Sequence, residues 1–238
     1  MNMDLSPLWI SLKTALSATA VTFVLGVLAA GWRSGRSSRL WELFDGLVLL
    51  PLVLPPTVVG FVLLSLFGRT GPLGQILWRA GTILVFSWSA TVIAATVVAF
   101  PLMYLTARGA FEQIDPGLFD AARTLGATEW EILVGVAIPL AWPGILAGVA
   151  LAFARAMGEF GATLMFAGNI PGRTETMPVA IYFAIAAGDT RQALLWSGIV
   201  LVISLGVLAA MDGWTRYQRR YLARGTRGVV RGGSVARG

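Results

Sequence analysis

Cysteine and histidine are both missing from this chain, and charged residues make up only 13% of its 238 residues. The two absences exclude disulfides, thiol nucleophiles, imidazole bases and the commonest metal ligands. A soluble domain is about one quarter charged, so this sequence has too little polar surface to cover a water-soluble globule of its size. We therefore expect no catalytic residue and no metal site, and the composition argues against a soluble enzyme.

Hydrophobic residues, in contrast, make up 56% of the chain and are gathered into long runs. A bilayer core about 30 Å thick needs about 20 apolar residues in a helix. Five runs meet this length, at residues 8–30, 47–67, 82–105, 138–157 and 194–211. They predict an all-α polytopic membrane protein with about five transmembrane helices. A sixth span that includes residues 177–187 is the alternative, but that stretch is short, so we prefer an amphipathic outer helix or a re-entrant piece.

Arginine supplies all but one of the 18 basic residues, and its distribution predicts the orientation. The connector after the first run carries three arginines and the tail after the fifth carries seven. Because cytoplasmic loops are rich in basic residues, the N-terminus is expected outside and the C-terminus inside. The net charge of +6 is then an anchor and orientation signal, and no nucleic-acid partner is expected. We divide the chain into one membrane domain, residues 1–220, and a basic cytoplasmic tail, residues 221–238, which we expect to be disordered.

Helix-breaking residues and a charge pair mark the second and fourth runs. Pro51, Pro55 and Pro56 lie within nine residues of the second run's start, and proline removes a backbone hydrogen bond and kinks a helix. The cluster indicates a helix that lines a path or bends during a cycle, with a static kink as the alternative. Arg155 and Glu159 have the i, i+4 spacing of an ion pair on one helix face. No intramembrane carboxylate relay is visible, so energy for transport is expected from elsewhere.

The connector between the third and fourth runs, residues 107–137, predicts a short helix. Asp115 is a good N-cap, Pro116 suits the first helical position, and Gly126 is a natural stop. Together they predict a helix over residues 116–125.

One face of this short helix is apolar. The residues of this face recur at helical spacing: Leu118, Ala121, Ala122 and Leu125. Phe119 projects beside them. A small amphipathic helix of this kind fits a groove on a partner, and lying flat on the lipid headgroups is the alternative. Its surroundings are acidic, which suits an anionic inner leaflet poorly. Thr128 and Glu131 then fit a capping box that begins a second helix leading into the fourth run.

The same connector resembles the loop motif of bacterial ABC importer permeases, which is Glu-Ala-Ala, three residues, Gly, nine residues, Ile-x-Leu-Pro. This chain has Asp120-Ala121-Ala122, then Gly126, then Val136-x-Ile138-Pro139, with every spacing matched and three conservative exchanges. In that family the short helix is the coupling helix, which sits in a cleft on the ATP-hydrolysing subunit. The resemblance implies that role for Asp120, Ala121, Ala122 and Gly126. We add Leu118 and Phe119 as expected contacts with the partner.

Two further segments, residues 50–60 and 154–172, resemble the molybdate permease subunits of this family, with the sulfate/thiosulfate permeases as near relatives. The resemblance implies a type I ABC importer permease in the bacterial inner membrane, which forms the translocation path for an oxyanion by alternating access. Molybdate is the expected substrate, with tungstate close to it, and sulfate or thiosulfate is the alternative. The implied partners are a second copy of the chain, two cytoplasmic ATPase subunits and an extracytoplasmic oxyanion-binding protein.

The sequence contains no Gly-x-x-x-x-Gly-Lys-Ser/Thr segment, so the chain is not expected to be an enzyme or to hold a cofactor. ATP and Mg²⁺ are expected on the partner subunit. We also predict that the second and fourth runs form an outer gate, unless the charge pair at residues 155 and 159 merely fixes a loop. The candidate gate residues are Pro55, Pro56, Thr57, Arg155, Gly158, Glu159 and Gly161.

Two other classes remain as remote alternatives. An intramembrane enzyme would need clustered carboxylates or a serine, histidine or metal constellation at one membrane depth. A secondary transporter usually shows internal repeats and ionisable groups inside the membrane. The acidic residues here are scattered and no repeat is visible, so both classes are disfavoured.

Overall fold

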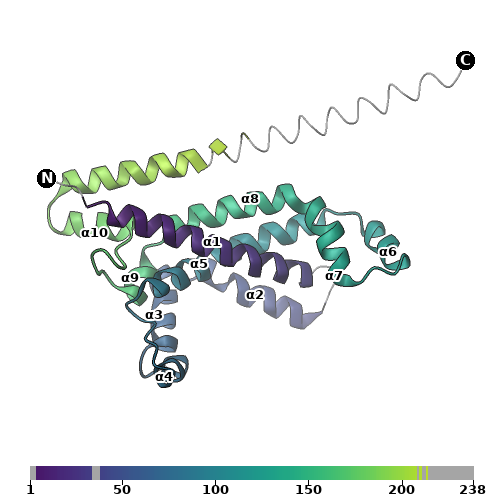
Figure 1. Ribbon diagram of the computed structural model, residues 1–238, viewed down its shortest axis with the longest axis horizontal. Helices are drawn as coiled ribbons and strands as arrows, with labels where there is room; N and C mark the ends of the chain where they lie inside the picture. Colours follow the sequence, from purple (N-terminus) through teal and green to yellow (C-terminus); the bar gives the residue numbers. More distant parts are fainter. Residues whose placement is uncertain (1–3, 34–37, 208, 211–212, 214–238) are drawn as a thin grey trace, which may run out of the picture.

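A computed structural model describes residues 4–33, 38–207, 209–210 and 213, and this part of the chain contains helices and no strand (Figure 1). Four of its helices are long and apolar enough to cross a membrane: α1 (Ser6–Arg33), α5 (Trp88–Glu112), the stretch Glu129–Met157 and the helix Thr190–Val207. A bent pair, α2 and α3, would make a fifth span. The prediction of an all-α chain with about five spans is confirmed.

The core lies where α1, α5 and α8 (Ile138–Met157) pack against one another (Figure 1). Small side chains let the helix backbones come close, which is typical of membrane helix packing. Fully buried alanines recur along all three helices, and the larger buried residues fill the space between them: Met103, Tyr104, Phe111 and Ile145. A second core cluster joins α3 to α5 and α9 (Gly161–Ala167).

Polar contacts fasten the outer part of this bundle. The hydroxyls of Thr14 and Thr91 lie 3.0 Å apart, and the indole N–H of Trp88 donates to Thr14 at 3.1 Å. The Ser11 hydroxyl accepts from the Met177 backbone N–H at 2.7 Å. Lys13 Nζ lies 3.8 Å from the centre of the Trp88 ring. The hydrogen bonds of buried Ser11, Thr14 and Thr91 satisfy groups that would otherwise be costly to bury, whereas Lys13 is exposed.

The second apolar run is a bent pair of helices, broken at the proline cluster that indicated a kink. It forms the end of α2 (Arg39–Val53) and the whole of α3 (Pro56–Phe67), whose axes meet at 113°. Leu54 and Pro55 between them have ψ angles of 143° and 136°. A residue before proline is driven out of the α region, and two consecutive prolines therefore end one helix and start another.

Two other helix starts differ from the apolar runs. Helix α5 starts later than residue 82, because Ser87 caps it. The fourth span starts earlier, since α7 (Glu129–Ile132) continues through a π-helical segment, η1 (Leu133–Ala137), into α8. Pro139 has no backbone N–H to donate to the preceding turn of the helix, which accounts for the irregular backbone hydrogen bonding of η1.

The short helices lie at the two ends of the bundle. Helix α6 (Pro116–Thr124) lies at one end, and α9 and α10 (Met177–Ala186) lie at the other (Figure 1). Helix α10 is too short to span a bilayer, and its side chains are apolar on every side, so the amphipathic character predicted there is wrong. The alternation of connectors between two ends agrees with the expected topology, while the assignment of inside and outside stays a prediction. The tail at 221–238 lies outside the described residues.

Candidate functional site

Helix α6 forms as the capping signals predict. The Asp115 carboxylate accepts a hydrogen bond from the Gly117 N–H at 2.9 Å, and Gly126 follows the helix at φ +88°, a conformation that favours glycine. The second helix begins with a complete capping box, in which the Thr128 hydroxyl accepts from the Glu131 N–H and Glu131 accepts from the Thr128 N–H. The chain therefore makes two sharp, well-defined turns on either side of α6.

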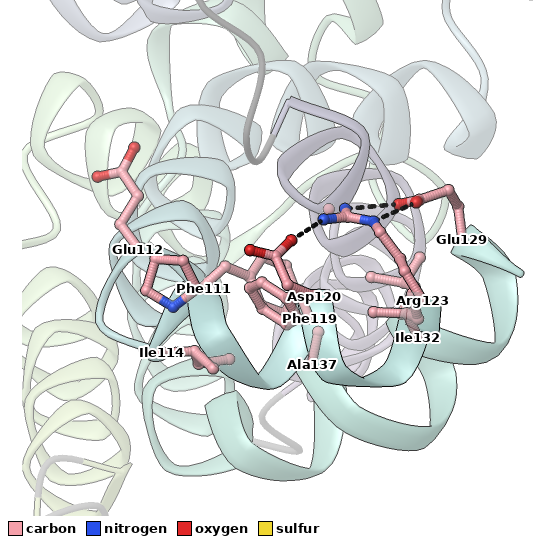
Figure 2. Close-up of a pocket in the computed structure, with 12 residues that line it drawn as sticks. Phe111, Glu112, Ile114, Phe119, Asp120, Arg123, Glu129, Ile132 and Ala137 are labelled. Atoms are coloured by element: carbon pink, nitrogen blue, oxygen red, sulfur yellow. Dashed lines mark hydrogen bonds and ion pairs between the residues drawn. The ribbon is translucent and has the colours of Figure 1, made fainter. Parts of the chain in front are cut away.

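A single arginine fastens α6 to the start of the fourth span (Figure 2). Arg123 donates to Asp120 at 3.0 Å and forms a two-pronged contact with Glu129 at 2.8 and 3.2 Å. These bonds, with Glu129 first, raise the pKa of the Arg123 guanidinium above its ordinary value. The pair is half exposed and so contributes little stability, but a two-pronged geometry fixes orientation. Sequence reasoning missed Arg123, although acids three residues before it and six after it were the available signal.

A pocket of about 260 Å³ lies between α6 and the bundle (Figure 2). Charged residues of α6 and α7 line one part of it, and apolar residues line the rest: Phe111, Ile114, Phe119, Ile132, Leu133 and Ala137. Phe119 is half-buried and packs against the core. Phe119 therefore supports the helix from beneath, and its predicted role as a contact for a partner stays a prediction.

The outer face of α6 is apolar and open. Leu118 is 47% exposed and Leu125 is 88% exposed, and Ala121 lies exposed between them. Ala122 is half-buried, and Asp120 is exposed but paired with Arg123. The structure therefore places the predicted face at one end of the molecule, on a helix that is held from behind.

The two predicted gate segments come into contact. A Cβ atom built on Gly161 would lie 3.0 Å from Pro56 Cβ and 3.2 Å from Thr57 N, so Gly161 leaves just enough room for the start of α3. Pro55, Pro56 and Thr57 are exposed on their other side. The break between α2 and α3 and the break between α8 and α9 thus lie against each other.

The predicted charge pair lies at the second break. Arg155 Nη1 lies 2.8 Å from Glu159 Oε2, and Glu159 is only 2% exposed. The other carboxylate oxygen of Glu159 accepts from the Ala162 N–H at 2.8 Å. Glu159 therefore joins the end of α8 to the first turn of α9, while Gly158 is exposed at the C-cap of α8.

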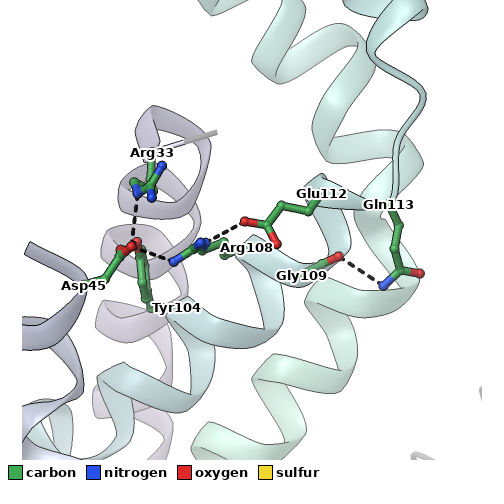
Figure 3. A network of polar contacts seen from close by, with 7 residues as sticks. All are labelled: Arg33, Asp45, Tyr104, Arg108, Gly109, Glu112 and Gln113. Carbon is green, nitrogen blue, oxygen red and sulfur yellow. Dashed lines mark hydrogen bonds and ion pairs between the residues drawn. The ribbon is translucent and has the colours of Figure 1, made fainter. Parts of the chain in front are cut away.

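A charge network at the α6 end of the bundle was not predicted (Figure 3). Asp45 Oδ2 lies 2.7 Å from Arg108 Nη1 and 3.1 Å from Arg33 Nε, and Asp45 Oδ1 accepts from the Tyr104 hydroxyl. Arg108 also reaches Glu112 at 2.7 Å. The network joins α1, α2 and α5, and no local sequence spacing indicated the three contacts of Asp45.

Comparison with known proteins gives one family. The profile described as "Binding-protein-dependent transport system inner membrane component" matches residues 22–220. A putative molybdenum transport system permease protein of Bacillus subtilis is 46% identical over 85% of this chain and 90% of its own length. The molybdenum transport system permease proteins of Escherichia coli K12 and Haemophilus influenzae are 45% and 40% identical, each over 85% of this chain and 88% and 91% of their own lengths.

Solved structures of ABC transporters share the fold. An inward-facing methionine ABC transporter covers 89% of this chain and 94% of its own, with a TM-score of 0.70 at 19% identity. A bacterial ABC transporter that imports the acidic polysaccharide alginate covers 87% of this chain and 78% of its own, with a TM-score of 0.68 at 16% identity. At these identities the likeness concerns the architecture of the membrane helices.

Proposed function

Because the chain belongs to the family of binding-protein-dependent transport system inner membrane components, we propose that it is the permease subunit of an ATP-driven importer of molybdate. One observation supports molybdate as the substrate: three molybdenum transport permeases are 40–46% identical to this chain over 85% of its length. These relatives favour molybdate over the sulfate and thiosulfate alternative. Tungstate has the same charge and tetrahedral shape as molybdate and belongs to the same proposal.

The membrane subunit is proposed to work as a homodimer with two ATPase subunits. One chain has one helix α6 and about five spans, which is too few to enclose a path. Helix α2 has no buried residue of its own, and it exposes Leu40, Leu43 and Leu47 along its length. A second copy in the membrane would cover such a face without a polar cost. ATP and Mg²⁺ are assigned to the cytoplasmic partner, and this chain supplies neither a nucleotide site nor a cofactor.

Helix α6 is proposed to dock on the ATPase. Its exposed apolar face, Leu118, Ala121 and Leu125, offers a contact, and Phe119 and Arg123 hold the helix from behind. A helix that is fixed at several points transmits a displacement as a rigid body, because its packed support leaves few alternative positions. ATP-driven movement of the partner would then move the ends of α5 and α7.

The contact between the two helix breaks is proposed as the outer gate. Gly161 and Pro56 lie at the contact, and Glu159 ties α8 to α9 beside it. A tilt of α8 would therefore shift α9 against α3. A tight cationic site at mid-membrane would trap a dianion, and selection is assigned to the extracytoplasmic binding protein that delivers the oxyanion.

The substrate is tested with the complete assembly in lipid vesicles. Binding proteins loaded with molybdate, tungstate or sulfate are added outside, and ATP hydrolysis and uptake are measured. We expect molybdate and tungstate to stimulate both. Stimulation by sulfate alone would refute molybdate as the substrate. If no loaded binding protein stimulated hydrolysis or uptake, the importer function would be refuted.

The docking of α6 is tested at Gly126, whose φ of +88° disfavours a β-branched side chain. Gly126→Val should abolish substrate-stimulated hydrolysis, whereas Gly126→Asn should retain much of it, because asparagine tolerates this conformation. No side chain lies within 4 Å of the site, so the strain is confined to the backbone. Normal coupled transport by Gly126→Val would overturn the docking.

A further inference from the structure

We propose that Asp45 is a positioning residue that transmits the movement of the coupling end of the protein to α2, and thereby to the break at the gate. This inference rests on the proposed importer function and adds a route inside the chain. The argument depends on where Asp45 lies, how α2 is attached, and where α2 leads.

Asp45 gathers three donors from two other helices (Figure 3). Arg33 ends α1, and Tyr104 and Arg108 lie on α5, and all three reach the one carboxylate. The side chains of Asp45 and Arg33 are only 14% and 12% exposed. A charged group this poorly hydrated depends on its partners, and breaking such a network is costly.

Helix α2 has other, mainly aromatic attachments to the bundle, and Trp41 meets Trp32 of α1 edge to face at 5.3 Å. None of its residues is buried, and α5 is its main neighbour among the described helices. Half-buried Phe44 and Val48 pack on the core, and Phe44 meets the Tyr104 ring edge to face at 6.1 Å. The charge network and this aromatic contact are next to each other, so α2 is held to α5 at one level of the bundle.

Few residues separate α6 from Arg108, and few separate Asp45 from the break between α2 and α3. Helix α5 ends at Glu112, four residues after Arg108, and α6 begins at Pro116. From Asp45, about 12 Å of helix leads to the end of α2 at Val53, after which the chain turns by 113° into α3. Movement at the base of α6 therefore reaches Arg108 within one helical turn, and α2 carries it as a lever to the break. Glu112 binds the same arginine from within α5 and cannot transmit anything to α2.

The matched pair Asp45→Asn and Glu112→Gln tests the route. Each removes one carboxylate from Arg108, but only Asp45→Asn removes the charged link between α5 and α2. In the complete assembly with its ATPase and molybdate-loaded binding protein, we expect Asp45→Asn to lower uptake per ATP hydrolysed about tenfold. Glu112→Gln should leave that ratio near the unmodified value. Equal ratios in the two variants would overturn the inference.

Spin labels separate transmission from a simple loss of structure. The chain has no cysteine, so single cysteines at exposed Leu52 on α2 and at exposed Gln113 after α5 are labelled uniquely. In the unmodified assembly both labels should respond to a non-hydrolysable ATP analogue. With Asp45→Asn, the Gln113 label should still respond and the Leu52 label should not.

Each outcome decides between two failures. A Leu52 response that survives Asp45→Asn overturns the role of Asp45 but not the importer function. The absence of any response at both labels in the unmodified assembly overturns the importer function itself. If Asp45→Asn does not assemble, Arg108→Gln removes the charged link between α2 and α5 and leaves the Arg33–Asp45 pair in place. A Leu52 response that survives Arg108→Gln would likewise overturn the inference.

Discussion

The contact between α3 and α9 at Gly60 yields the sharpest prediction. A Cβ atom at this glycine would lie 2.7 Å from Ala162 Cα, 2.8 Å from Met165 Cβ and 2.9 Å from Ala162 O. Ordinary contact begins at 3.4 Å, so Gly60→Ala must push the two helices apart by about 0.7 Å. Two of the three obstructing atoms are backbone, which cannot rotate away.

The expected cost follows from this geometry. Overpacking of a tight contact costs about 1–3 kcal/mol, and the better helix propensity of alanine returns up to about 1 kcal/mol. We therefore expect Gly60→Ala to lower the free energy of unfolding by about 1–2 kcal/mol, which corresponds to a Tm lower by several degrees, about 2–4 °C per kcal/mol. Uptake should fall as well, because the displaced contact is the proposed gate.

Gly109→Ala is the matched control. It also lies inside a helix, α5, and nothing stands within 4 Å of its added Cβ. Its Tm should stay level or rise, because only the propensity gain remains. Thermal unfolding of both variants in detergent, followed by tryptophan fluorescence, measures the difference. A Gly60→Ala variant as stable as Gly109→Ala would refute the close approach of α3 and α9.

Three further changes have defined outcomes. Glu159→Gln should be more stable than Glu159→Ala by about 1 kcal/mol in thermal unfolding, because the glutamine oxygen can still accept from Ala162 N–H; equal stability would contradict this capping role. Asp115→Ala removes the N-cap of α6 at a cost of about 1 kcal/mol, so amide exchange in α6 should speed up about fivefold, and unchanged exchange would contradict it. Burial, with the charge of Asp4 second, raises the pKa of Glu175 above 4.5. The folded chain therefore binds the Glu175 proton more tightly than the unfolded chain does. Protonation of Glu175 stabilises the fold fully below the pKa of the unfolded state, and this stabilisation is lost as the pH rises through the pKa of the folded state. Glu175→Gln should therefore flatten the fall in Tm above about pH 4.5, and an unchanged slope would refute the assignment.

The local features of the chain could be read from its sequence. Apolar run length located the spans, and the cap at Asp115, the stop at Gly126 and the capping box at Thr128 located α6 and its neighbour. These signals act over a few residues, through backbone groups that each helix end leaves unpaired. The prolines at 55 and 56 also marked a break, but its angle of 113° could not be derived from them. Two extended residues permit many directions, and packing against α9 selects one.

Long-range pairs could not be read in the same way. Asp45 and Arg108 are 63 positions apart, and nothing in either segment indicates the other. The spacing of Phe119 places it beside the apolar face of a surface helix, yet its side chain lines the pocket and packs against the core. Such contacts depend on how whole helices are placed, and that placement follows from small residues and close approaches spread over the bundle.

The sequence by itself therefore determined the approximate positions of the spans, the ends of α6, the membrane class and the apolar face of α6, because hydrophobicity, caps and breakers act locally. The tertiary structure alone decided that the two helix breaks touch, that Arg123 and Phe119 support α6, and that Asp45 ties α2 to α5. These arrangements join segments far apart in the chain, and their free energy is gained only after the bundle has packed.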